Sequence, residues 1–195
     1  MIFTPTDIAG AFIIDIDRLE DDRGFFARSY CRREFEDHDL SPNLVQCNIS
    51  FNKFKGTLRG LHSQKQPHQE AKVMRCTRGA LFDVILDLRP KSPTWLKHVA
   101  VELTRDNHRM LYAPEGVFHG FLTLEENTEI FYQMSEYYVS GVDMGVRWND
   151  PAFGIKWPMD PVVISDRDRD YPDFDPAAFG RWPIPSIRRS LFFTS

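Results

Sequence analysis

The sequence lacks any apolar run long enough to span a bilayer. Its first residues, MIFTPTDIAGAFIIDIDR, also lack the basic segment that opens a secretory signal peptide, and Asp7 and Asp15 flank their short apolar stretch. These absences remove the usual marks of an exported or membrane-inserted protein. We therefore expect a cytoplasmic protein with no membrane partner.

Positive charge and cysteine are also scarce. The chain has 24 lysine and arginine residues against 28 aspartate and glutamate residues, which gives a formal net charge of -4 at pH 7. This balance argues against a nucleic-acid partner, because neutralising a phosphate backbone requires a surplus of basic residues. The three cysteines, Cys31, Cys47 and Cys76, show no C-x-x-C spacing, so we expect reduced thiols in a reducing compartment.

Short β-type segments make up most of what is present. In GALFDVILDLR, residues 79–89, Phe82, Val84, Leu86 and Leu88 alternate with a more polar face that includes Asp83. Strands spaced about every 8–12 residues by Pro, Gly and Asx turns predict an all-β sandwich, jelly roll or barrel. A short helix is expected in the second half of FFARSYCRREFEDH. We expect one domain over residues 1–172 and a C-terminal tail over 173–195, packed on the domain or on a dimer partner.

Two stretches contain histidines in contexts typical of cupins. PEGVFH, residues 114–119, has the P-x-G-x-x-H spacing of the second cupin motif. The first motif usually has H-x-H and a later glutamate, but here it has His62, Ser63 and Gln64, with Glu70 further on. A catalytic transition-metal site generally needs about three protein ligands and an open position. Because one ligand is replaced, we expect no metal and histidines available for acid–base chemistry.

The stretch KGTLRGLHSQ, residues 55–64, places Arg59 and His62 beside Gly56 and Gly60. Glycines inside a strand-like run indicate a turn, a bulge or a close approach of the backbone. The segment is therefore either a basic hairpin edge or an anion site beside a titratable base.

Eight stretches occur in order along the chain: DDRGFF (21–26), VQCN (45–48), GTLRGLHSQ (56–64), AKVMRCTRGALFDVILDLRPKSPT (71–94), LYAPEGVFHGF (111–121), IFYQMSEYY (130–138), GVRWNDPAFGIKWP (145–158) and ISDRD (164–168). Taken together, they resemble the dTDP-4-dehydrorhamnose 3,5-epimerase family, a branch of the cupins that uses no metal. The resemblance covers about residues 1–172 and implies a cupin-type jelly roll, a double-stranded β-helix barrel with short peripheral helices.

The resemblance implies a catalytic set for inverting the carbons that flank a 4-keto group in a nucleotide-linked 6-deoxyhexose. His62 matches the family's base, and Asp168 matches the carboxylate that orients it, with Asp83 as the competing partner. Lys72 matches the residue placed near the keto oxygen, where an ammonium would stabilise an enolate. Tyr132 matches the acid on the opposite face of the sugar. No cofactor is needed for this chemistry.

The resemblance also implies contacts for a nucleotide-diphosphate sugar. Arg59 and Arg23 match contacts to the diphosphate, for which the planar guanidinium is well suited. Tyr138 matches an aromatic that stacks on the nucleobase. In the family the DDRGFF segment reaches the neighbouring subunit's active site, which implies a homodimer with exchanged N-terminal segments. The remaining expected contacts are Phe26, Arg28, Gln46, Asn48, His119, Asp143 and Arg167.

One position departs from the family pattern. Arg28 stands where the family commonly has a glutamate that contacts the nucleotide, so the nucleobase of the substrate stays open. The alternatives to a 3,5-epimerase are a 3- or 5-monoepimerase, a ketoisomerase, a non-catalytic sugar-binding cupin and a metal-dependent cupin. The joint presence of a base, an acid and a lysine argues against a module that only binds.

Overall fold

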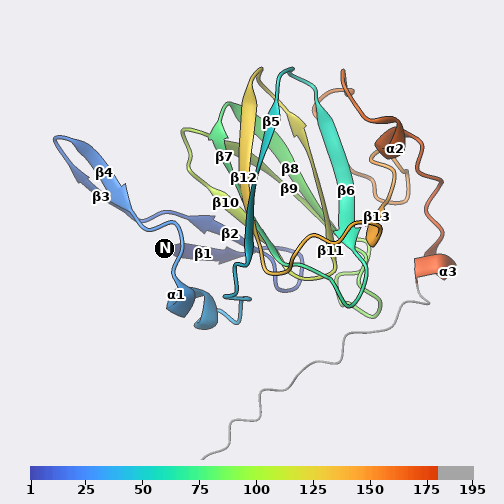
Figure 1. The fold of residues 1–195 in the computed structure, drawn as a ribbon, viewed down its shortest axis with the longest axis horizontal. Helices are drawn as coiled ribbons and strands as arrows, with labels where there is room; N and C mark the ends of the chain where they lie inside the picture. The colour runs from blue at the N-terminus through green and yellow to red at the C-terminus, as the bar shows by residue number, and fades with distance from the viewer. Residues whose placement is uncertain (180–195) are drawn as a thin grey trace, which may run out of the picture.

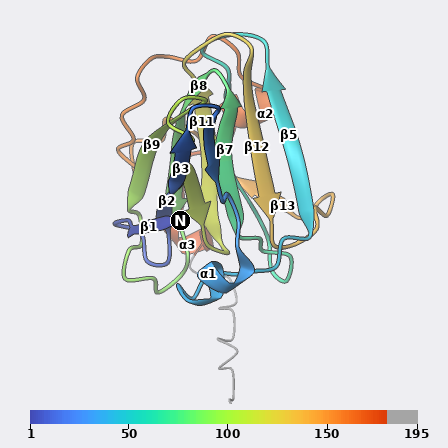
Figure 2. The ribbon, with the colours of Figure 1, turned by 90° about the vertical axis from the view of Figure 1, so that its left-hand side faces the viewer.

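The structure is a computed structural model and describes residues 1–179. Two antiparallel sheets face each other and enclose the core, which confirms the predicted all-β, cupin-type architecture (Figures 1 and 2). The six-stranded sheet has the order β1 (Ile2–Pro5), β2 (Phe12–Asp15), β10 (Met110–Ala113), β7 (Lys72–Arg78), β12 (Thr128–Met134) and β5 (Gln46–Asn52). The five-stranded sheet has the order β13 (Asp143–Gly145), β6 (Leu58–Gln64), β11 (Val117–Thr123), β8 (Ala80–Asp87) and β9 (His98–Thr104).

The remaining elements lie at the periphery of the two sheets. A separate two-stranded ribbon projects from the body (Figure 1). Of the three short helices, the first lies between this ribbon and β5, where the sequence predicts a helix, and the other two follow β13. None of the helices in the described part of the chain has the length and apolar character needed to cross a bilayer. These elements are β3 (Arg18–Asp21), β4 (Gly24–Ala27), α1 (Arg32–Glu36), α2 (Asp166–Arg169) and α3 (Pro176–Phe179).

Strand β8 is buried on both faces, which differs from the predicted contrast between an apolar and a polar face. Leu81 and Ile85 pack in the core between the sheets. Val84 and Leu86 point the other way and are covered by apolar residues that follow β13. The face interpreted as polar is therefore an inner face, and Asp83 on it has no exposed surface. A carboxylate there requires a specific partner.

The segment that covers the outer face of the five-stranded sheet continues beyond the predicted domain boundary. Phe174 packs against Phe153, with ring centroids 5.0 Å apart, and against Trp95 at 6.1 Å. Its backbone N–H donates to Asp150 Oδ2 at 2.7 Å. The start of the expected tail thus packs on the domain, while the segment RWPIPSIRRSLFFTS lies outside the described residues.

An irregularity in β6 sets the directions of its functional side chains. His62 pairs with His119, but Arg59 pairs with Phe121, so three steps along β6 oppose two along β11. Gly60 lies between them with φ +118°, and a Cβ there would lie 2.4 Å from the Gly120 Cα atom. Only glycine accommodates this approach. The bulge places Arg59 and His62 on the same side of the sheet, although an odd separation normally places residues on opposite sides.

Candidate active site

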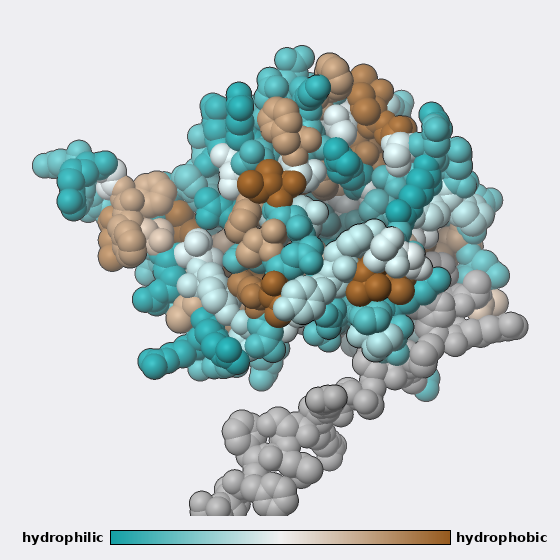
Figure 3. Space-filling view, in the orientation of Figure 1, coloured by the Kyte–Doolittle hydropathy of each residue, from teal (hydrophilic) through white to brown (hydrophobic). Residues whose placement is uncertain are grey.

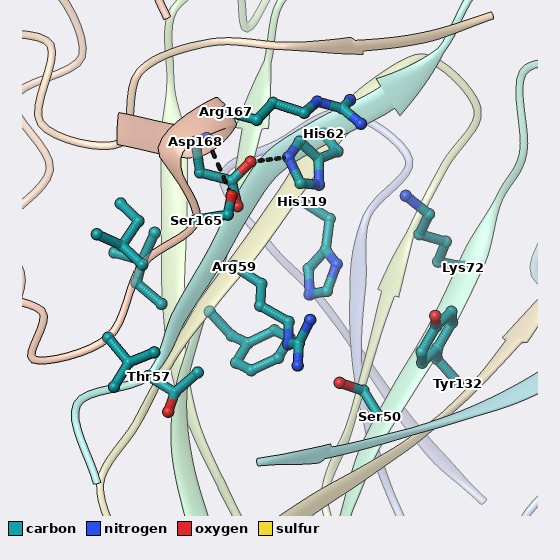
Figure 4. A pocket seen from close by; sticks show the side chains of 14 residues that line it. Ser50, Thr57, Arg59, His62, Lys72, His119, Tyr132, Ser165, Arg167 and Asp168 are labelled. Atoms are coloured by element: carbon teal, nitrogen blue, oxygen red, sulfur yellow. Dashed lines mark hydrogen bonds and ion pairs between the residues drawn. The ribbon is translucent and has the colours of Figure 1, made fainter. Parts of the chain in front are cut away.

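A cavity of about 560 Å³ opens between the two sheets beside α2 (Figure 4). A second hollow of about 390 Å³ adjoins it and shares four lining residues with it, so the two form one site. We call the larger cavity the first wing of this site and the smaller hollow the second wing. This volume suits a ligand larger than a single sugar. The shared residues are His62, Lys72, Tyr132 and Arg167.

His62 is held by a carboxylate from the short helix α2. Its Nε2 lies 2.6 Å from Asp168 Oδ1, and the other oxygen of Asp168 accepts the backbone N–H of Gly60 at 3.1 Å (Figure 4). Ser165 caps α2 by accepting the backbone N–H of Asp168 at 3.1 Å. The cap and the two contacts fix Asp168 beneath the imidazole, so the carboxylate orients the ring.

Asp168 stays ionised well into the acid range. Burial acts to raise its pKa, but the hydrogen bond and the charge attraction of His62, together with the Gly60 N–H, outweigh burial and hold the pKa below 3.8. An ionised partner stabilises the imidazolium that forms when a histidine takes a proton. The pair is therefore suited to general-base chemistry.

A second histidine–carboxylate pair lies in the same cavity. His119 Nε2 is 2.6 Å from Asp83 Oδ1, and both residues come from the five-stranded sheet. Asp83 was the competing partner for His62, and the structure pairs it with His119 instead. His119 is thus an oriented ring at the cavity wall, as expected for a pocket contact.

Lys72 and Tyr132 enter the cavity from the other sheet, on β7 and β12. Tyr132 shares the inner face of β12 with the buried Ile130 and Met134, as the sequence predicts. Burial raises the pKa of Tyr132 above 10, while the charge of Arg59 acts in the opposite direction. The phenol therefore remains protonated at neutral pH and can donate. Figure 4 shows His62 and Tyr132 on opposite walls of the cavity.

The first wing contains Arg59, whose side chain is fixed from within its own chain. Its Nε donates to Asn52 Oδ1 at 2.8 Å, and Asn52 is buried at the end of β5. Ser50 and His119 line the same wing (Figure 4). The guanidinium is a fixed positive charge near Tyr132, at a place where an anionic or electron-rich ligand group would be favoured.

The second wing contains most of the predicted nucleotide contacts. Gln46 accepts the backbone N–H of Tyr138 at 3.1 Å and donates to Asn48 Oδ1 at 3.2 Å. Arg167 forms an ion pair with Asp143, and both line this wing. The ring of Tyr138 is more than half exposed, which leaves it open to stacking by a flat ligand.

Three residues that are predicted to contact the substrate lie outside the cavity of their own chain. Arg23 is in the β3–β4 turn, where it pairs with Asp21 and is 89% exposed in its side chain. Phe26 is 73% exposed on the same ribbon. Arg28 binds Glu34 at 2.6 Å, so the cation that replaces the family's glutamate has its own partner on α1. Arg23 and Phe26 would need a second subunit to reach a site.

Gln64 and Glu70, at the positions of metal ligands in other cupins, form a hydrogen bond with each other. Gln64 Nε2 donates to Glu70 Oε2 at 3.0 Å, and Glu70 Oε1 lies 2.8 Å from the Lys72 ammonium. A carboxylate already neutralised by a lysine and an amide that presents N–H groups are poor metal ligands. Within residues 1–179 no group of three or more candidate metal ligands comes together.

Two neighbours of the site were not identified as functional from the sequence. Tyr171 accepts a hydrogen bond from Arg167 Nε at 2.7 Å, and its ring lies 6.3 Å from that of His62. Glu70 stands out in the sequence only as the late glutamate of a cupin motif, and that position is a usable signal. Nothing in the sequence around Tyr171 distinguishes it from a core aromatic.

Comparison with known proteins places the chain among nucleotide-sugar epimerases. The family model described as dTDP-4-dehydrorhamnose 3,5-epimerase matches residues 5–176. The dTDP-4-dehydrorhamnose 3,5-epimerase of Sinorhizobium fredii is 41% identical over 88% of this chain and 89% of its own length.

Solved structures agree with the family match. The dTDP-4-dehydrorhamnose 3,5-epimerase from Bacillus anthracis, with TDP and PPi bound, has a TM-score of 0.84 and 39% identity, covering 89% of this chain and 99% of its own. A 3'-monoepimerase from Streptomyces bikiniensis, in complex with dTDP-quinovose, has a TM-score of 0.82 and 29% identity, covering 92% of each chain. The extent of these matches shows that the chain is an isomerase of the dTDP-4-dehydrorhamnose 3,5-epimerase family.

Proposed function

We propose that this protein inverts C3 and C5 of a dTDP-linked 4-keto-6-deoxyhexose in deoxysugar biosynthesis. One observation carries the proposal: His62 and Tyr132 come from opposite sheets and face one cavity, with Lys72 between them (Figure 4). Inversion requires removal of a proton from one face of a carbon and its return to the other. This arrangement provides a base, an acid and a cation for that sequence.

The chemistry follows from the contacts of each group. Asp168 accepts the Nε2 hydrogen of His62, which leaves Nδ1 to take the proton next to the ketone. The electron pair of that C–H bond moves onto the keto oxygen, where the Lys72 ammonium stabilises the enolate. The Tyr132 phenol then donates its proton to the opposite face of the carbon. His62 then releases its extra proton to solvent, and the Tyr132 phenolate takes up one proton from solvent, which restores both groups for the next cycle.

A 3-monoepimerase is the alternative, because the Streptomyces bikiniensis 3'-monoepimerase shares this fold. The test is NMR of the dTDP-4-keto-6-deoxyglucose reaction in heavy water. Deuterium at C3 and C5, with ring coupling constants of the doubly inverted product, supports the proposal. Inversion at C3 alone would reject it in favour of the alternative, and the absence of exchange at both carbons would reject the epimerase function.

We propose that the reaction runs without a metal. Glu70 pairs with both Gln64 and Lys72, which supports this proposal because Gln64 and Glu70 occupy the cupin ligand positions. Treatment with a chelator should leave the rate of inversion unchanged. Stoichiometric iron, zinc or manganese in the purified protein, with activity lost on its removal, would contradict the proposal.

We also propose a homodimer in which the β3–β4 ribbon completes the neighbour's site. Leu19 and Phe26 pair across the ribbon and are 68% and 73% exposed, and Figure 3 shows the apolar surface of this projection. Mixing Arg23→Ala and His62→Ala subunits should restore activity, since one site of each heterodimer keeps both residues. No recovery after verified subunit exchange would show that each chain builds its own site.

The remaining parts of the proposal concern compartment and nucleobase. Three free cysteines support a reducing compartment, so we propose a cytoplasmic enzyme. Glu34 neutralises the charge of Arg28 within the same chain, so the cation that stands in place of the family's glutamate does not by itself argue against thymidine. Competition between TDP and UDP for binding tests this choice, with tighter binding of UDP as the contrary result.

A further inference from the structure

Glu70 forms a buried ion pair that the proton transfers above do not use. Its side chain is 2% exposed, and one oxygen lies 2.8 Å from the Lys72 ammonium. The other oxygen accepts Gln64 Nε2 at 3.0 Å. A buried carboxylate without such partners would be costly, so the two contacts fix its orientation. Lysine has a long flexible stem, and pairing it with a fixed carboxylate restricts where its charge lies.

Gln64 connects this pair to the nucleotide wing. Its Oε1 accepts the backbone N–H of Val139 at 2.8 Å, and its Nε2 also donates to the carbonyl of Tyr137 at 3.2 Å. These two backbone groups flank Tyr138, which lines the second wing. Gln64 is only 3% exposed, so the connection runs through the protein interior. A continuous series of contacts thus joins the Tyr138 segment to the Lys72 ammonium.

We propose that Glu70 is a positioning residue that holds the Lys72 ammonium at the substrate's keto oxygen, and that Gln64 ties this position to the nucleotide-binding segment. The inference rests on the proposed function, in which Lys72 stabilises the enolate. Electrostatic stabilisation depends on a charge being in place before the reaction begins. Residues at two former metal-ligand positions of the cupin fold therefore serve here to place a cation.

The test is a double-mutant cycle on Glu70 and Lys72. Glu70→Gln keeps the shape of the side chain and removes its charge, so kcat for inversion should fall about 10–100-fold while KM changes less than about threefold. If Glu70 acts through Lys72, the double variant Glu70→Gln/Lys72→Met should be no slower than Lys72→Met alone. Effects that multiply would show that Glu70 acts independently of Lys72 and would overturn the proposal.

Three further variants separate positioning from folding. Glu102→Gln makes the same charge change on the exposed face of β9 and should leave kcat unchanged. Glu70→Asp keeps the charge but shortens the reach to Lys72, so kcat should fall several-fold in a folded protein. Gln64→Met should raise KM and lower kcat together, because it releases both ends of the connection. Wild-type kinetics from Glu70→Asp and Gln64→Met would overturn the proposal even if Glu70→Gln did not fold.

The outcome is distinguishable from a failure of the proposed function. A wild-type protein that neither exchanges nor inverts the 4-keto sugar rejects the function itself. An active wild-type enzyme with a Glu70→Gln variant of equal kcat rejects only the positioning role. Calorimetry with TDP gives a readout besides catalysis: Gln64→Met should bind TDP more weakly, whereas Glu70→Gln should bind it within about threefold of wild type.

Discussion

The two histidine–carboxylate pairs of the cavity have the same 2.6 Å contact but different surroundings. The His62 side chain is 32% exposed and its partner Asp168 accepts a second hydrogen bond from the Gly60 N–H. The His119 side chain is 12% exposed, and Asp83 has no exposed surface. Among the described residues, the second oxygen of Asp83 has no hydrogen-bond partner.

This difference separates two roles that the contact distance alone does not. A base must reach the substrate and must have a partner that stays ionised as it takes up a proton. His62 meets both conditions, because it lines both wings and because the pKa of Asp168 is held below 3.8. His119 lines only the first wing. The comparison therefore predicts that His62 transfers the proton and that His119 binds the sugar.

The largest expected effect on the reaction rate comes from replacing the imidazole of His62, and for comparison that of His119, with the amide of asparagine. His62→Asn should reduce inversion and deuterium exchange at every substrate carbon by about 10²–10⁴-fold, as for loss of a positioned base. His119→Asn should keep exchange at both carbons and mainly raise KM, because it removes one wall contact. Both rates are measured by NMR in heavy water. Exchange lost in His119→Asn but kept in His62→Asn would reverse the assignment.

The next largest effect concerns Tyr132, on the cavity wall opposite the two histidine–carboxylate pairs. Tyr132→Phe keeps the packing of the ring on the inner face of β12 but removes the proton that the raised pKa keeps in place at neutral pH. We expect inversion to fall about 10²-fold or more while exchange through His62 continues.

The ratio of exchange to inversion, measured by NMR, tests the role of Tyr132. Phe131→Leu provides a control on the same strand, since Phe131 lies on the opposite face of β12. Unimpaired inversion by Tyr132→Phe would move the acid to another residue.

Much of this site could be predicted from the sequence because its residues lie in local motifs. Ile130, Tyr132 and Met134 are alternate residues of β12, so the inward direction of Tyr132 follows from the burial of Ile130 and Met134. The pairing of Asp168 with His62 could be expected from the family motif. By itself the DRDRD run is typical of a solvated loop, and only the tertiary fold buries Asp168.

Other features depend on contacts between distant segments and could not be derived from the pattern. Arg59 and His62 are three residues apart, so regular alternation places them on opposite faces; the bulge at Gly60 brings them together. The inner position of Asp83 follows from the segment after β13, which covers the outer face of β8. Nothing in the local sequence shows which face of a strand a distant segment will cover.

Replacing the two carboxylates, Asp168 and Asp83, should also have different effects on activity. Asp168→Asn can still contact His62, but its amide N–H can force the imidazole into the wrong tautomer, so kcat should fall by at least about tenfold. Asp83→Asn should lower kcat less than about fivefold, because His119 does not transfer the proton. Circular dichroism verifies that both variants fold. Equal losses in the two variants would remove the functional distinction between the pairs.

The smallest expected effect is on stability in acid, and it concerns the first pair alone. The pKa of Asp168 is lowered in the folded protein because the contacts of His62 and the Gly60 N–H outweigh burial. A lowered carboxylate pKa stabilises the fold above the unfolded value of about 3.8, and this contribution is lost as pH falls through the folded value. Hydrogen bonds to a charged group are worth roughly 1.5–3 kcal/mol.

Urea unfolding of wild type and Asp168→Asn measures this contribution. Wild type should be more stable than the variant by roughly 1.5–3 kcal/mol at pH 5, the range for hydrogen bonds to a charged group. The difference should shrink below pH 3.8, because only wild type loses an ionised carboxylate there. Asn has no charge to titrate, so the variant provides its own reference for all other acid-sensitive groups. A difference that stays constant from pH 5 to the acid limit would show that the ionised form of Asp168 does not stabilise the fold.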